Sequence, residues 1–120
     1  MEDLPTIRDQ ISRKDLFDAF KEQLAKDFEQ SNCSSQFAES LQPNYDDILN
    51  RIQQELQINE RRSDFNLMQL LYRIDINEMQ LKKYLGENSA RIHYYVIADL
   101  IIKRTLQKVM TRKYYKGKDE

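Results

Sequence analysis

The chain of 120 residues contains one cysteine, one histidine, two glycines, two prolines and no tryptophan. The lone thiol, Cys33, has no partner for a disulfide within the chain and excludes a cysteine-rich zinc site. The lone imidazole, His93, excludes a multi-histidine metal centre. Glycine and proline supply most tight turns and phosphate-binding loops, so their scarcity argues against a β-sandwich, a Rossmann unit and a P-loop.

A long apolar run is also missing. The longest apolar stretch, 94–102, is interrupted by Asp99 and is far shorter than the roughly 20 residues that span a bilayer. The first ten residues, MEDLPTIRDQ, are acidic and have neither the basic nor the apolar region of a signal peptide. We therefore expect a cytoplasmic protein with a reduced thiol and no membrane span.

The residues that are present favour helices. Hydrophobic residues make up 40% of the chain and charged residues 32%, a balance typical of globular proteins. Apolar residues recur at helical spacing. The pattern predicts short helical segments at 4–11 and 35–43 and longer helices at 12–30, 44–57, 64–74, 77–85 and 90–114. We expect a single all-α domain over 1–120, an irregular bundle of about five helices organised by the long C-terminal one, with 1–11 and 115–120 frayed.

Polar residues mark where these helices begin. Ser12 and Asp15 resemble a capping box, and Asn44 with Asp47 starts the next long helix. Further expected caps are Ser35, Ser63 or Asp64, Asp75 or Asn77, and Ser89. Glu22 and Lys26 have the i,i+4 spacing of an ion pair on the outer side of their helix.

Two predicted helices are apolar on more than one side. In 64–74, one face comprises Phe65, Met68, Leu71 and Tyr72, and the other comprises Leu67, Leu70 and Ile74. Apolar residues on both faces predict burial between neighbours. In the last helix the main apolar arc comprises Ile92, Tyr95, Val96, Ile102, Leu106, Val109 and Met110. A second arc of Tyr94, Ile97 and Ile101 lies roughly opposite. It is expected to face either a second copy of the chain or the rest of this one.

The charge is unevenly distributed. Residues 1–60 carry 6 Lys/Arg and 13 Asp/Glu, whereas residues 61–120 carry 13 and 7. Arg104, Lys108 and Arg112 form a basic stripe at i, i+4 and i+8, which Lys113, Tyr115 and Lys116 continue. The stripe is expected to contact phosphates of nucleic acid, an acidic partner, or acidic residues of this chain such as Asp15, Asp18, Asp46 and Asp47. A merely solvated basic face is the remaining alternative.

Candidates for catalysis are few. His93 has no evident acid or base partner, and Cys33 lies in a Ser/Asn-rich loop without a neighbouring base. Asp99 is the exception among polar residues because it falls within the main apolar arc. A buried carboxylate must be paired or protonated, so we expect it to contact Lys103, Arg73 or a tyrosine hydroxyl. We predict no catalytic residue, metal or cofactor.

A DNA-binding alternative arises from three successive helices at 45–58, 64–74 and 77–85. In a helix-turn-helix arrangement the third would present Gln80, Lys82 and Lys83 to the major groove.

The sequence favours a small non-enzymatic module for protein–protein interaction or oligomerisation, with a homodimer as one form. The alternative is a nucleic-acid-binding protein that uses the basic C-terminal helix. No small-molecule substrate is indicated.

Overall fold

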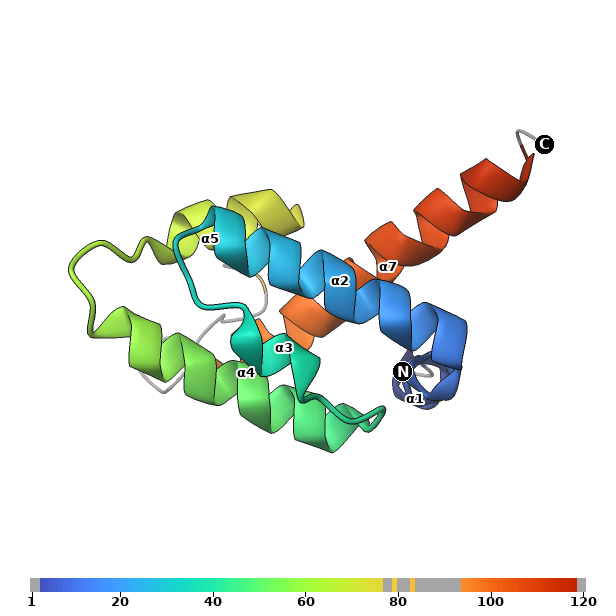
Figure 1. The fold of residues 1–120 in the computed structure, drawn as a ribbon, viewed down its shortest axis with the longest axis horizontal. Helices are drawn as coiled ribbons and strands as arrows, with labels where there is room; N and C mark the ends of the chain where they lie inside the picture. The colour runs from blue at the N-terminus through green and yellow to red at the C-terminus, as the bar shows by residue number, and fades with distance from the viewer. Residues whose placement is uncertain (1–2, 77–78, 80–82, 84–93, 119–120) are drawn as a thin grey trace.

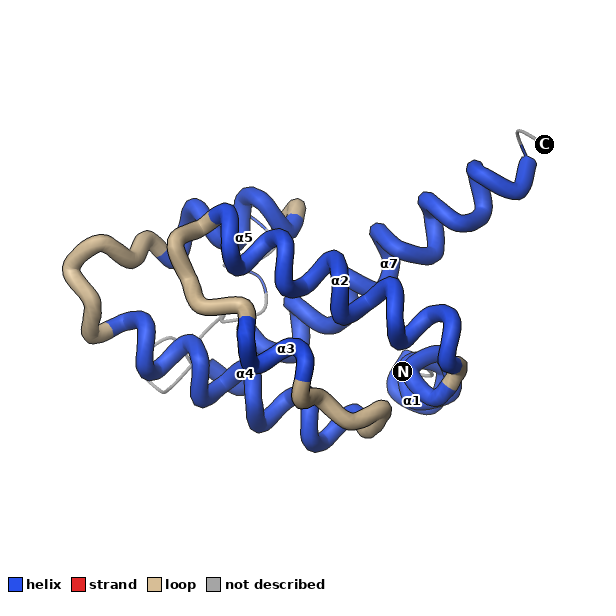
Figure 2. The backbone as a smooth tube through the Cα atoms, viewed as in Figure 1, coloured by secondary structure: helices blue, strands red, loops and turns tan. Residues whose placement is uncertain are grey.

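The chain folds into helices joined by short loops (Figure 1). The computed structural model describes the backbone of residues 3–76, 79, 83 and 94–118, and side chains between 7 and 113 within those ranges. Its helices are α1 (Asp3–Ser12), α2 (Lys14–Gln30), α3 (Gln36–Glu39), α4 (Tyr45–Glu60), α5 (Leu67–Ile74) and α7 (Tyr94–Lys118). Figure 2 shows only helix and loop in this part of the chain, which confirms the all-α class.

The start of α4 follows the predicted local chemistry. Asn44 is the N-cap residue, and its side chain accepts a hydrogen bond of 2.9 Å from the backbone N–H of Asp47. Such a cap satisfies one of the N–H groups that the first turn leaves without a partner. Asn66 caps α5 in the same way through the N–H of Gln69.

Two predicted caps were wrong. Ser12 ends α1 and donates its hydroxyl to the carbonyl of Asp9, so it does not cap α2. The N-cap of α2 is Arg13, whose extended backbone separates the two helices without a side-chain cap. Neither Ser63 nor Asp64 caps α5, because that helix begins later, after Asn66.

Helix α7 is the organising element of the bundle, as predicted. Its contacts with α4 and with α2 are more extensive than those of any other described pair of helices. Figure 1 shows α7 crossing behind α2 before its C-terminal part extends away from the bundle. Its buried residues meet those of the other helices in one core. The largest fully buried side chains are Phe20, Phe28, Ile11, Leu24, Ile48, Ile52, Leu56, Leu70, Leu71, Ile74, Ile101 and Ile102.

The predicted two-sided burial of α5 was wrong. Leu70, Leu71 and Ile74 are buried, but Met68 is 41% exposed and Tyr72 is 83% exposed. The helix therefore packs through one face and presents the other to solvent. In α7, Tyr95 and Met110 belong to the predicted main arc and are likewise exposed.

Helix α1 packs against the bundle through two isoleucines. Ile7 and Ile11 of α1 are buried in the core, so this part of 1–11 contributes to packing. Most of the predicted helix at 77–85, which is also the proposed third DNA-binding helix, lies outside the described residues, as do the cap at Ser89, Ile92 and His93. Among the residues that the structure describes, no helix combines the length and apolar character needed to cross a membrane.

Candidate interaction surface on the C-terminal helix

The first cation of the basic stripe of α7, Arg104, binds a residue of its own chain. Arg104 donates from Nε to the backbone carbonyl of Asp75 at 3.2 Å and from a terminal nitrogen to its carboxylate at 2.9 Å. Asp75 ends α5 in a left-handed conformation, with φ of 79°. Arg104 therefore binds the C-terminal end of α5, where the helix dipole favours a cation.

Lys108, one turn further along, is also engaged. Its Nζ lies 3.1 Å from Oδ2 of Asp27 on α2 and 3.0 Å from the carbonyl of Arg73 on α5. Asp27 is only 4% exposed, and its other oxygen accepts a hydrogen bond from the buried amide of Gln23 at 3.1 Å. Lys108 thus joins three helices, and neither it nor Arg104 has its charge free for an external phosphate.

Sequence reasoning did not identify Asp27 as a buried partner of the basic stripe. Its position gave a signal, because residue 27 lies three after Leu24 and directly before Phe28, inside the apolar arc of α2. A carboxylate at such a position needs a buried partner.

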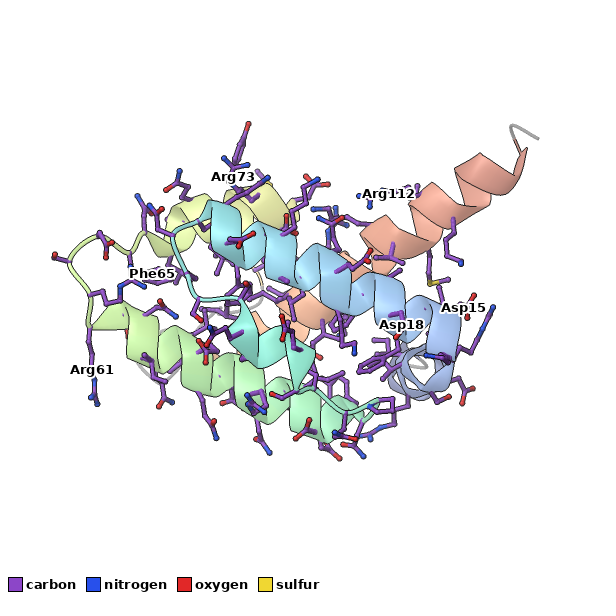
Figure 3. The ribbon with its side chains drawn as sticks, in the orientation of Figure 1. Asp15, Asp18, Arg61, Phe65, Arg73 and Arg112 are labelled. Atoms are coloured by element: carbon purple, nitrogen blue, oxygen red, sulfur yellow. The ribbon has the colours of Figure 1, made fainter. Side chains whose placement is uncertain are left out.

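Arg112 differs from the other two members of the stripe. Its side chain is exposed and forms no ion pair with a described residue. Figure 3 places it where α7 leaves the bundle, beside α2. Its neighbour Lys113 pairs with Asp15 of α2 at 3.2 Å, and this hydrogen bond lowers the pKa of the Asp15 carboxyl. The side chains of Tyr115 and Lys116 lie outside the described residues.

The chain's own carboxylates therefore occupy much of the stripe. Asp15 was among the predicted intramolecular partners, and Asp27 and Asp75 were not. The other three named acids lie elsewhere: Asp18 pairs with Lys14, Asp46 with Arg8, and Asp47 accepts from the N–H of Gln42.

A groove between α2 and α7 has three cationic side chains among its lining residues, namely Lys26, Arg112 and Lys113. It has a volume of about 350 Å³ and is lined by Ala19, Glu22, Gln23 and Lys26 from α2 and by Val109, Arg112 and Lys113 from α7. The predicted ion pair between Glu22 and Lys26 does not form, and Lys26 is exposed without an ion pair to a described residue. Sequence spacing placed Lys26 on the outer side of α2 but gave no indication that it would share a groove with Arg112.

Asp99 has the kind of partners that the sequence predicted. Its side chain is 19% exposed and lies 2.9 Å from Nζ of Lys103, and it also accepts a hydrogen bond from the hydroxyl of Tyr45 on α4. Burial, followed by this hydrogen bond, raises the pKa of Tyr45 far above its ordinary value. Arg73, the other suggested partner, instead donates to Gln30. The site is a polar contact between α4 and α7.

The predicted interface residues lie inside the chain. Ile97 is 3% exposed and Ile101 is 0% exposed, while Tyr94 packs against the same core. The chain's own helices therefore cover Ile97 and Ile101, as one of the two alternatives for this arc predicted.

The thiol of Cys33 is buried, and burial raises its pKa to about 11. It is therefore protonated at neutral pH, and a protonated thiol is a poor nucleophile. Among the described residues, no three His, Cys, Asp or Glu side chains are grouped as metal ligands.

Comparison with known proteins gave no relative: no family model, no curated protein and no solved structure matches this chain.

Proposed function

We propose that this protein is a small, non-enzymatic helical module for protein–protein interaction, which acts in the cytoplasm and contacts its partner through the exposed part of α7. The observation that carries the proposal is the division of the basic stripe. Arg104 and Lys108 stabilise the packing of α7 on α5 and α2, whereas Arg112 is unpaired among the described residues where the helix leaves the bundle.

This division favours a protein partner over nucleic acid. Binding to duplex DNA through all three stripe cations would give a slope of log K against log salt near −2.7, at about −0.9 per neutralised phosphate. With two of the cations engaged by Asp75 and Asp27, the stripe supplies one phosphate contact and a slope of about −0.9.

Nucleic-acid binding is the second candidate function, because α7 extends beyond the bundle (Figure 1) and carries further lysines in its sequence at 113, 116 and 118. Titration of duplex DNA, single-stranded DNA and single-stranded RNA over a range of salt concentrations separates the two functions. Our proposal expects weak binding at physiological salt and a shallow slope. Tight binding that Arg112→Gln weakens would overturn it.

The partner itself is sought by affinity capture from nuclease-treated extract of the source organism, with a matched control. Arg112→Glu reverses the charge at the proposed contact, and Arg61→Glu makes the same change at the far end of α4 (Figure 3). We expect a protein that wild type and Arg61→Glu retain and Arg112→Glu loses. Sedimentation of the purified chain tests whether the partner is a second copy. The proposal is wrong if the captured proteins and the sedimentation behaviour are the same for both variants.

A further inference from the structure

We propose that the groove between α2 and α7 is a docking site for acidic side chains of a partner protein. The inference rests on the proposed function and specifies the chemistry of the partner.

The charges that line the groove come from both of its walls. Lys26 on α2 and Arg112 and Lys113 on α7 outnumber the single carboxylate among the lining residues, Glu22. Lys113 is balanced by Asp15, but Lys26 and Arg112 have no ion pair with a described residue. Two cations from two helices therefore face one groove without an ion pair to a described residue, and Glu22 offsets only one of the two charges. This excess of positive charge is complementary to a carboxylate.

The walls of the groove are held at a fixed spacing. Gln23 lines the groove and is 6% exposed, and its amide donates to Asp27, which in turn pairs with Lys108 of α7. This buried network ties α2 to α7 next to the groove. A site whose walls are already fixed loses less conformational entropy when a ligand binds.

The composition of the groove favours a protein segment over a nucleic-acid strand. Ala19, which is half-buried, and Val109 are among its lining residues, so apolar groups lie beside the two unpaired cations. A peptide with carboxylates next to an apolar side chain matches both features. A phosphate backbone needs cations in a continuous track, and Arg104 and Lys108, which would continue the track along α7, are engaged.

The probe for this site is an alanine-based helical peptide with glutamates at i and i+4 beside a central leucine. A matched peptide with glutamines in their place is the peptide control. The protein variant is Lys26→Gln/Arg112→Gln, which removes two exposed and unpaired charges and leaves the core unchanged. The control variant is Arg51→Gln/Arg61→Gln, which changes the net charge equally on α4.

We expect the groove variant to bind the acidic peptide with an affinity about tenfold lower than that of wild type. This is the effect of losing a charge-assisted contact. The control variant should bind within about twofold of wild type, since its cations lie away from the groove and contribute only screened, long-range attraction. The glutamine peptide should bind weakly to all three proteins. Equal melting temperatures would show that the variants remain folded.

Two results overturn the inference alone: absence of binding of the acidic peptide to wild type, and equal loss of binding in the groove and control variants. In either case the proposed function is tested separately, by the capture and sedimentation experiments. If single-stranded DNA binds more tightly than the peptide and the groove variant loses that binding, the inference and the proposed function are both wrong.

Discussion

Lys108 and Asp27, 81 positions apart in the sequence, form an ion pair of 3.1 Å between α7 and α2. The carboxylate is almost completely buried and the ammonium group is mostly covered, with side-chain exposures of 5% and 22%. A pair of this kind contributes less than its Coulomb energy suggests, because both ions lose hydration. Removal of one partner is nevertheless expensive, since the other remains buried without its counter-charge.

We therefore predict that Lys108→Met destabilises the fold by about 2–4 kcal/mol, somewhat below the range for fully buried pairs because Lys108 keeps some exposure. The double variant Asp27→Asn/Lys108→Met should recover part of this loss, since its amide leaves no unpaired charge and still accepts from Gln23. Urea unfolding of wild type, both single variants and the double variant gives the coupling free energy. Additive effects would mean that the pair does not form in solution.

The contact between Tyr45 and Asp99 predicts a dependence of stability on pH. The pKa of Tyr45 is higher in the folded chain than its ordinary value of 10. The protonated phenol is thus favoured by folding. Its stabilising contribution is complete below pH 10 and declines as the pH rises above that value, because the unfolded chain then loses the proton first.

Tyr45→Phe isolates this effect from the titration of other groups. The variant should be less stable than wild type at neutral pH by about 1 kcal/mol, the net value of one hydrogen bond. The difference should shrink above pH 10. Asp99→Ala should cost more, about 1–3 kcal/mol, because it leaves the buried hydroxyl of Tyr45 without its acceptor. A constant difference between wild type and Tyr45→Phe across the pH range would contradict the assignment.

Local signals in the sequence predicted the helices better than their contacts. The cap at Asn44 and the apolar arcs of α2 and α4 depend on residues a few positions apart, so spacing was sufficient to place them. The cap at Ser12 was misjudged because the same hydroxyl can serve the end of one helix or the start of the next. The hydroxyl of Ser12 donates to the carbonyl of Asp9, so it serves the C-terminal end of α1.

The candidate site was less predictable than the fold. Charge counts left contact between the acidic and basic halves as one of several alternatives. They gave no means of choosing Asp27 and Asp75 among 13 and 7 carboxylates in the two halves. The groove that brings Lys26 to Arg112 depends on how α2 crosses α7. That crossing is set by side-chain packing over the whole core, which helical periodicity does not specify.

Substitutions of Asp75 compare the cost of its left-handed backbone conformation with the stabilisation from its ion pair with Arg104. A residue other than glycine in the left-handed region costs roughly 1 kcal/mol, and Asn tolerates it better than Ala. The pair with Arg104 is mostly solvent-exposed on the Asp75 side and is therefore worth at most about 1 kcal/mol. We predict that Asp75→Gly leaves stability nearly unchanged, Asp75→Asn lowers it slightly, and Asp75→Ala lowers it most. Thermal melts give the order, and an Ala variant as stable as the Gly variant would contradict the left-handed assignment.

Ile97 tests whether the second apolar arc of α7 belongs to the core. The side chain is 3% exposed within a single chain, so a carboxylate there would be buried without a partner. We expect Ile97→Asp to cost at least about 3–5 kcal/mol, by analogy with a broken buried ion pair, which is a large part of the stability of a domain this size. Circular dichroism should show loss of helix, or a melting temperature lowered by tens of degrees.

Tyr95→Asp is the matched control, because it places the same charge two residues earlier at a position that is 56% exposed. It should change stability by about 0.5 kcal/mol or less, as surface substitutions generally do. Sedimentation of both variants completes the test. If Ile97 instead lay at a contact between two copies, Ile97→Asp would give a stable, folded monomer from a wild-type dimer, and the core assignment would be wrong.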